Sequence, residues 1–259
     1  MNEHALITGE WDWAGQTILH PIGLAMLVVL GIMMLFCPRR YAVVPMILMA
    51  CFLSSRQRIS LGGLDFTMLR MMVLFGWVRV IARREMIGFK WHSLDKCIVL
   101  FALSGTVIYT IREATLGALI YKLGMSFDAM GMYFLFRQLF KSWADIEAVS
   151  TVLVVVSVPV AIAFTIEGMT GRNIFSAFGG VREFTAIREG RLRCQGAFTH
   201  PILAGCFWAS LLPLMAAAWW RGGAGRLLAV IGTSAAVLII ILCASSTPVI
   251  ALLAVWLGA

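Results

Sequence analysis

The sequence has few charged residues: they make up 13% of its 259 residues, whereas 61% are apolar. A soluble domain usually has about 25% charged residues, so the composition argues against a soluble globular protein. The mean hydropathy of +0.90 points the same way. Stretches without any charge, such as 201–220 and 227–259, are long enough to cross the roughly 30 Å of bilayer hydrocarbon as helices. The sequence therefore predicts an all-α, polytopic transmembrane helical bundle.

The usual patterns of metal and redox sites are also missing. The 6 cysteines are scattered without a CxxC pair, and the 4 histidines stand far apart without an HExxH pattern. We therefore expect no metal and no cofactor. The net charge of +8 comes with a strong preference for Arg over Lys. In a membrane protein such an excess is expected to meet lipid headgroups or an anionic lipid-linked substrate, and not nucleic acid.

The apolar runs predict about eight spans in a single transmembrane domain that covers 1–259. The predicted spans are 17–36, 41–54, 64–81, 94–111, 127–140, 148–166, 201–219 and 227–244. Pro248 interrupts the apolar tail, because proline removes a helical hydrogen bond. Residues 249–259 would then form a partial ninth span that crosses about half of the hydrocarbon. We therefore expect an incomplete domain, truncated at its C-terminus.

The distribution of basic residues sets the orientation, because inner loops are enriched in Lys and Arg. With the N-terminus outside, nine basic residues lie in inner loops: Arg39, Arg40, Arg83, Arg84, Lys90, Lys96, Lys141, Arg221 and Arg226. The expected outer loop 167–199 conflicts with this rule, since it adds five arginines to the four basic residues of the other outer loops. A topology shifted by one span at 127–140 would place Arg221 and Arg226 outside, so it does not remove the conflict. We favour a function for the outer arginines.

Two interpretations of these arginines remain open at this point. The segment 181–193 could be an interfacial helix whose arginines touch anionic headgroups, with Val181, Phe184 and Ile187 on one face and Glu189 near Arg193. Alternatively, the arginines bind the diphosphate of a lipid-linked substrate. A leaving diphosphate gains negative charge in the transition state, which fixed guanidinium groups would stabilise.

His200 and Pro201 follow the arginines. Proline suits the first turn of a helix, so His200 is expected to cap the helix that begins there. The same dipeptide at His20–Pro21 shows that the pair alone has low specificity for a catalytic site.

The stretch Arg193–Pro201, RCQGAFTHP, resembles the signature R-x-x-G-x-F-x-H-P of the O-antigen ligase-like family of bacterial envelope proteins. Ser245–Pro248 is similar to a second turn of that family. The resemblance implies a periplasm-facing glycosyltransferase of the bacterial inner membrane, which moves a glycan from undecaprenyl diphosphate to an acceptor hydroxyl without a metal or a nucleotide sugar. It implies substrate-binding roles for Arg193, Arg191 and Arg188, and makes His200 the catalytic candidate. Expected partners are the lipid-linked glycan, membrane lipids and other polysaccharide-assembly proteins.

Two departures from the family pattern matter. Ligases commonly carry an arginine where this chain has Ser246, which favours a polymerase or exopolysaccharide role over a ligase. The family also continues into another outer loop that often holds a catalytic histidine. Two further functions stay open: a lipid-linked glycan transporter, and an inactive structural membrane fragment. A transporter should carry charges inside its spans, where this chain has Arg70, Arg79, Asp128 and Arg137.

Overall fold

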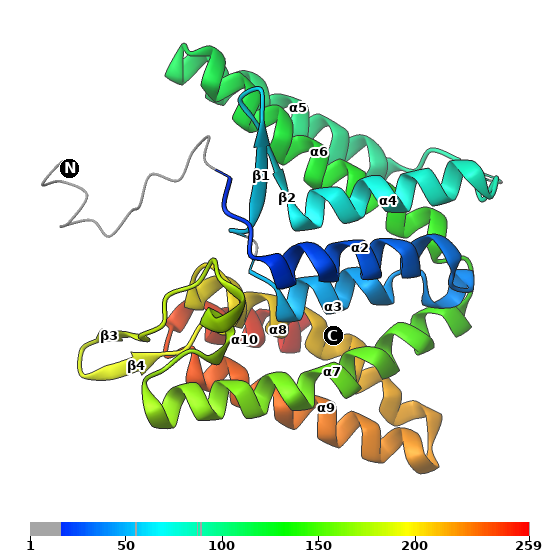
Figure 1. The fold of residues 1–259 in the computed structure, drawn as a ribbon. Coiled ribbons are helices and arrows are strands. Elements are labelled where there is room, and N and C mark those ends of the chain that lie inside the picture. Colours follow the sequence, from blue (N-terminus) through cyan, green and yellow to red (C-terminus); the bar gives the residue numbers. More distant parts are fainter. Residues whose placement is uncertain (1–16, 55, 87, 89, 259) are drawn as a thin grey trace, which may run out of the picture.

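The computed structural model describes residues 17–54, 56–86, 88 and 90–258. Helices run back and forth between two ends of the molecule, and two β-hairpins lie at one of them, which we call the hairpin end (Figure 1). We call the opposite end the far end. The helices are α2 (Pro21–Phe36), α3 (Val44–Phe52), α4 (Met68–Ala82), α5 (Ser93–Glu113), α6 (Leu116–Leu139), α7 (Trp143–Thr170), α8 (Pro201–Ala216), α9 (Gly223–Leu242) and α10 (Ser246–Gly258).

The all-α prediction is confirmed, and each predicted span overlaps one helix, from α2 to α9 in order, although α6 begins 11 residues before the span predicted at 127–140. The predicted number of about eight spans is not supported. Four helical segments of the described chain are long and apolar enough to cross a membrane: α5, α7, α9 and Pro201–Arg221, which joins α8 to a short 3-10 helix. The chain is therefore a multi-pass α-helical membrane protein.

The remaining helices are too short or too charged to meet the same criterion for crossing a membrane. At about 1.5 Å per residue, the 9 residues of α3 reach only about 14 Å, and the predicted third span splits into a β-strand and the 15-residue α4. The 24-residue α6 is long enough but contains Lys122, Asp128 and Arg137. The predicted partial ninth span forms the 13-residue α10.

The two hairpins were not predicted. Strands β1 (Arg58–Leu61) and β2 (Leu64–Thr67) pair antiparallel, as do β3 (Ala186–Arg188) and β4 (Arg191–Arg193). Each turn has two residues with positive φ: Gly62 and Gly63 in the first, Glu189 and Gly190 in the second. This is the pattern of a type I′ turn, whose twist matches that of the strands. The interpretation of 181–193 as an interfacial helix is therefore wrong, and so is the expected pairing of Glu189 with Arg193 along such a helix.

The core of the bundle is closely packed and apolar. Met34 of α2, Met72 of α4, Phe164 of α7 and Trp208 of α8 are all fully buried in one cluster that joins both halves of the chain. By contrast, α5 buries little of its surface, and its outward side chains, such as Phe101 at 81% exposed, are apolar. An apolar outer surface is expected where helices face lipid.

Three arginines of the bundle helices are paired with carboxylates. Arg70 of α4 forms two hydrogen bonds with Asp128 of α6, at 2.7 and 2.8 Å. Arg79 is buried and bonds to Glu85 and to the carbonyls of Met34 and Cys37 at the end of α2. The Arg137 side chain pairs with Asp95. These ion pairs join neighbouring elements of the fold.

Candidate functional site

The loop between α7 and α8 is anchored by a buried carboxylate. Glu167 lies in the last turn of α7 and is only 1% exposed. It accepts hydrogen bonds from the backbone N–H groups of Gly196 (2.9 Å) and Gln195 (3.1 Å), and from the Thr185 hydroxyl (3.0 Å). Two distant parts of the loop are thereby held to one side chain.

Further contacts fix the same segment. Asn173 donates to the Gly196 carbonyl at 2.7 Å and accepts from the Phe175 backbone N–H at 2.9 Å. The Cys194 N–H donates to the carbonyl of Leu242, the last residue of α9, at 3.1 Å. The stretch RCQGAFTHP is therefore attached to both α7 and α9.

The loop also contacts the connection between α3 and β1. The Ser54 hydroxyl donates to the Gly180 carbonyl at 2.9 Å, and the buried Gln57 amide donates to the Phe178 carbonyl at 2.7 Å. Gln57 in turn accepts from the His20 backbone N–H at 3.3 Å. These bonds join three segments that are far apart in the sequence.

Basic side chains lie within electrostatic reach of one another where these segments meet: Arg182 near Arg56, Arg56 near His200, and His200 near Arg193. We call Arg56, Arg182, Arg193 and His200 the arginine cluster. Burial lowers the pKa of Arg56, and the nearby Arg182 and Arg58 guanidinium groups lower it further. Burial also lowers the pKa of His200, with further contributions from Arg193 and Arg56. The cluster is therefore strongly positive, and its imidazole favours the neutral form.

Arg193 has an unusual environment within this cluster. It ends β4 and is half-buried, and its Nε is a buried nitrogen without a hydrogen-bond partner among the described residues. A buried donor of this kind normally has an acceptor, since leaving it unpaired costs free energy. An anionic ligand in the cluster would supply one.

The other two predicted substrate-binding residues lie elsewhere on the hairpin. Arg188 and Arg191 are exposed and face each other as cross-strand neighbours at its tip. The Arg188 Nε lies 3.5 Å from Oε1 of Glu189. The structure therefore brings Arg193 and His200 into one cluster and places Arg188 and Arg191 at the tip.

His200 is the N-cap of α8, as the sequence predicts. Its Nδ1 accepts a hydrogen bond from the Ile202 backbone N–H at 3.2 Å, and Pro201 follows in the first turn. His20 caps α2 in the same way, through the Ile22 N–H at 3.3 Å. Both caps lie at the hairpin end, and the pKa of His200 is lowered by partial burial and then by Arg193 and Arg56.

An apolar cavity of about 440 Å³ lies next to the signature stretch. Ala197 and Phe198 line it together with side chains of α3, α4, α6, α7 and α8, including Leu53, Leu69, Met132 and Phe207. Gly205 of α8 packs closely on the second family-like turn, because a Cβ there would lie 2.4 Å from Cγ of Pro248. The helix that follows the signature stretch is therefore in contact with the second family-like turn.

Several site residues were not predicted from the sequence. Arg56 and Arg182 were counted only for topology, and Glu167 and Gln57 were not singled out. A lone carboxylate at the end of an apolar run was the available signal for Glu167, because an unpaired charge there needs a reason. Within the described part of the chain, no group of three or more His, Cys, Asp or Glu residues could hold a metal ion.

No family model, no curated protein and no solved structure matches this chain.

Proposed function

We propose that this chain belongs to a periplasm-facing glycosyltransferase of the bacterial inner membrane, which moves a glycan from undecaprenyl diphosphate to an acceptor hydroxyl. The observation that carries the proposal is the arginine cluster, with the unpartnered buried Nε of Arg193 beside His200. Guanidinium groups bind phosphate through paired hydrogen bonds, so a diphosphate matches the cluster in charge and in hydrogen-bonding chemistry.

The neighbouring apolar cavity supports a lipid-linked substrate. A molecule with a diphosphate head and an apolar tail needs a positive site beside an apolar one. The cavity is lined by Ala197 and Phe198, which lie in the signature stretch between Arg193 and His200. This arrangement suits a lipid diphosphate better than a water-soluble phosphate ester.

The chemistry follows from the charges. The acceptor oxygen forms a bond to the anomeric carbon of the glycan, and the bond from that carbon to the diphosphate oxygen breaks. The diphosphate leaves with the electron pair, and the arginines stabilise its added negative charge. His200 is the candidate to accept the acceptor's proton at Nδ1, a step that requires the cap bond from the Ile202 N–H to open. Its lowered pKa favours the neutral form that can act as a base.

The charges within the bundle favour an enzyme over a transporter. A transport path would need charged side chains facing a passage. Arg70, Arg79 and Arg137 are instead bonded to carboxylates that join structural elements.

Mass spectrometry of lipid-linked and surface glycans tests the proposal, in the source bacterium with the complete gene. Arg193→Ala should cause undecaprenyl-linked material to accumulate: repeat units if the enzyme is a polymerase, long chains if it is a ligase. Arg193→Lys should also be impaired, by roughly tenfold or more, because Lys cannot replace a two-pronged contact. Arg172→Ala is the matched control, since Arg172 is exposed and pairs with Glu183 in the same loop. Unchanged glycans, with the variant protein present in the membrane, would refute the proposal.

A further inference from the structure

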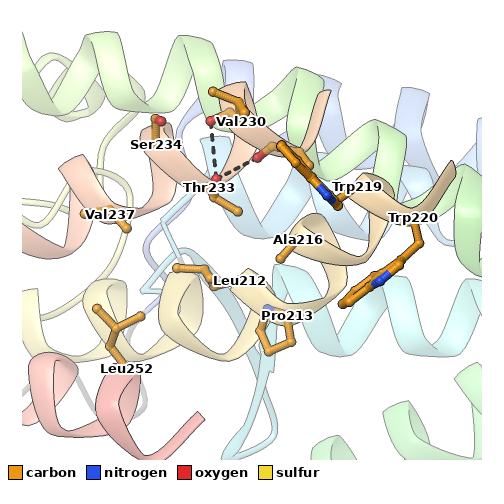
Figure 2. A pocket seen from close by; sticks show the side chains of 11 residues that line it. Leu212, Pro213, Ala216, Trp219, Trp220, Val230, Thr233, Ser234, Val237 and Leu252 are labelled. Carbon is orange, nitrogen blue, oxygen red and sulfur yellow. Dashed lines mark hydrogen bonds between the residues drawn. The ribbon is translucent and has the colours of Figure 1, made fainter. Parts of the chain in front are cut away.

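A second apolar cavity lies between α8, α9 and α10, away from the arginine cluster. It has a volume of about 750 Å³, and we call it the tryptophan groove. Its lining residues are Leu212, Pro213, Ala216, Trp219, Trp220, Ala229, Val230, Thr233, Ser234, Val237 and Leu252. Figure 2 shows the Trp219 and Trp220 rings at one end of the groove and Val237 and Leu252 at the other.

The groove offers almost no polar contacts to an occupant. Among the lining residues, hydroxyl groups come only from Thr233 and Ser234, and the two tryptophans add their indole N–H groups. The Thr233 hydroxyl donates to the Ala229 carbonyl of its own helix at 2.6 Å, a bond drawn in Figure 2. Its volume lies within the range of about 300–1,000 Å³ that is usual for small-molecule sites. The occupant of such a groove should be an apolar chain.

The depth of the groove matches one leaflet of a bilayer. From Ala229 to Val237, at about 1.5 Å per residue, α9 rises about 12 Å, compared with the roughly 15 Å of one hydrocarbon leaflet. Trp219 and Trp220 stand at the far-end turn, and Trp220 is 82% exposed. Tryptophan is enriched where a membrane meets water, so the groove runs from that boundary toward the bilayer centre.

Positive charge surrounds the mouth of the groove. Residues 217–226, which form the connection between α8 and α9 and the first turn of α9, contain Arg221 and Arg226 and no acidic residue. The Arg226 guanidinium lies 5.7 Å from the centre of the Trp219 ring, and Arg221 bonds to the Thr151 hydroxyl at 3.2 Å. Both arginines therefore lie at the depth of phospholipid phosphates.

We propose that the tryptophan groove binds one anionic phospholipid, with an acyl chain along α9 and the phosphate at Arg221 and Arg226. The inference rests on the membrane location of the helices and not on glycan transfer. Two arginines without a nearby carboxylate on this connection select a lipid with net negative charge over a zwitterionic one, because each adds attraction to the anionic headgroup.

Native mass spectrometry of the full chain in detergent tests this proposal, with palmitoyl-oleoyl-phosphatidylglycerol and the matched phosphatidylcholine as probes. Wild type should retain one phosphatidylglycerol and prefer it over phosphatidylcholine. In the double variant Arg221→Gln, Arg226→Gln, the preference should fall by about fivefold for each arginine. Arg40 is an exposed arginine at the same end, and the control variant Arg40→Gln should keep the preference for phosphatidylglycerol.

A groove-filling variant separates this site from general lipid contact. Ser234→Trp places a bulky side chain in the groove and should abolish retention of phosphatidylglycerol. Leu238→Trp, on an exposed position of α9 outside the lining, should retain it. Equal retention of both lipids by wild type, or unchanged retention by Ser234→Trp, would overturn the proposal. So would a dimer that Ser234→Trp converts to a monomer, because a second copy would then fill the groove. If Ser234→Trp fails to fold, the arginine variants decide the question.

Discussion

The carboxylate of Glu167 accepts a hydrogen bond from the backbone N–H of Gly196 at 2.9 Å, across 29 residues of sequence. Gly196 stands in the signature stretch, three residues after Arg193 and four before His200. The position of both site residues therefore depends on one buried side chain at the end of α7. Glu167 is a positioning residue, because its bonds go to the loop.

Glu167→Gln should destabilise the loop. The amide oxygen can keep the two bonds that Oε1 accepts, from the Thr185 hydroxyl and the Gln195 N–H, but the NH2 group would then face the Gly196 N–H and leave that buried donor unpaired. The expected cost is about 1–3 kcal/mol of unfolding free energy. Thermal unfolding of the purified protein in detergent measures it. Glu183→Gln is the control, because Glu183 forms only an exposed ion pair with Arg172. Equal shifts in the two variants would contradict the anchoring role.

Gly196→Ala should be more harmful than a matched glycine change on the hairpin. Gly196 has φ of +57° and a Cβ there would lie 2.3 Å from the Phe164 ring, whereas Gly190 has φ of +74° and nothing within 4 Å. Positive φ costs both variants about 1–2 kcal/mol, and the clash adds about 1–3 kcal/mol to Gly196→Ala alone. The difference between their unfolding temperatures measures the packing term. No difference would mean that Phe164 moves aside freely.

The two histidine caps form an internal comparison. His200→Ala and His20→Ala each remove a cap with the same geometry, so each should cost about 1 kcal/mol of stability. Only His200→Ala should also lower glycan transfer, since His200 lies in the arginine cluster. Unfolding temperatures and the glycan profile are measured for both variants. Equal activity in the two would return His200 to a purely structural role.

The cap of α8 should depend on pH. The pKa of His200 is lowered from 6.5 by burial, then by Arg193 and Arg56. The unfolded chain therefore binds a proton more readily than the folded one, so the stability from neutral His200 is present above pH 6.5 and is lost as the pH falls. Protonation of Nδ1 would also remove its bond from the Ile202 N–H. Between about pH 7 and about pH 5, wild type should lose more stability than His200→Ala. Parallel curves for the two proteins would exclude this effect.

The order of helices could be predicted from the sequence because local signals set it. Apolar runs form the helices, Pro21 and Pro201 mark two starts, and Gly171 ends α7 in a left-handed conformation. The number of spans was overestimated because an apolar run does not show whether its helix is as short as α3. The second hairpin was missed because Glu189 has positive φ, which its residue type does not favour. For the first hairpin, Gly62–Gly63 was an available turn signal.

Half of the candidate site could be predicted. Arg193 and His200 stand in a recognisable local pattern, and the structure brings them together. Arg56 and Arg182 join them only through long-range contacts, such as the bond from Ser54 to the Gly180 carbonyl across 126 residues. No local sequence pattern encodes a contact of that separation, so the full cluster needed the fold.

The side of the membrane that holds the hairpin end can be tested with cysteine labelling. Cys194 itself is a poor reporter, because it is 1% exposed and burial, followed by the nearby Glu167, raises its pKa to about 12. The thiolate is the reactive form, so Cys194 should stay unlabelled. In a Cys97→Ser background, which removes the exposed native cysteine, Arg191→Cys at the hairpin tip should react with an impermeant maleimide in intact spheroplasts. Arg40→Cys, exposed at the far end, should react only after permeabilisation. The reverse pattern would put the arginine cluster in the cytoplasm, and a periplasmic glycan transfer could not take place there.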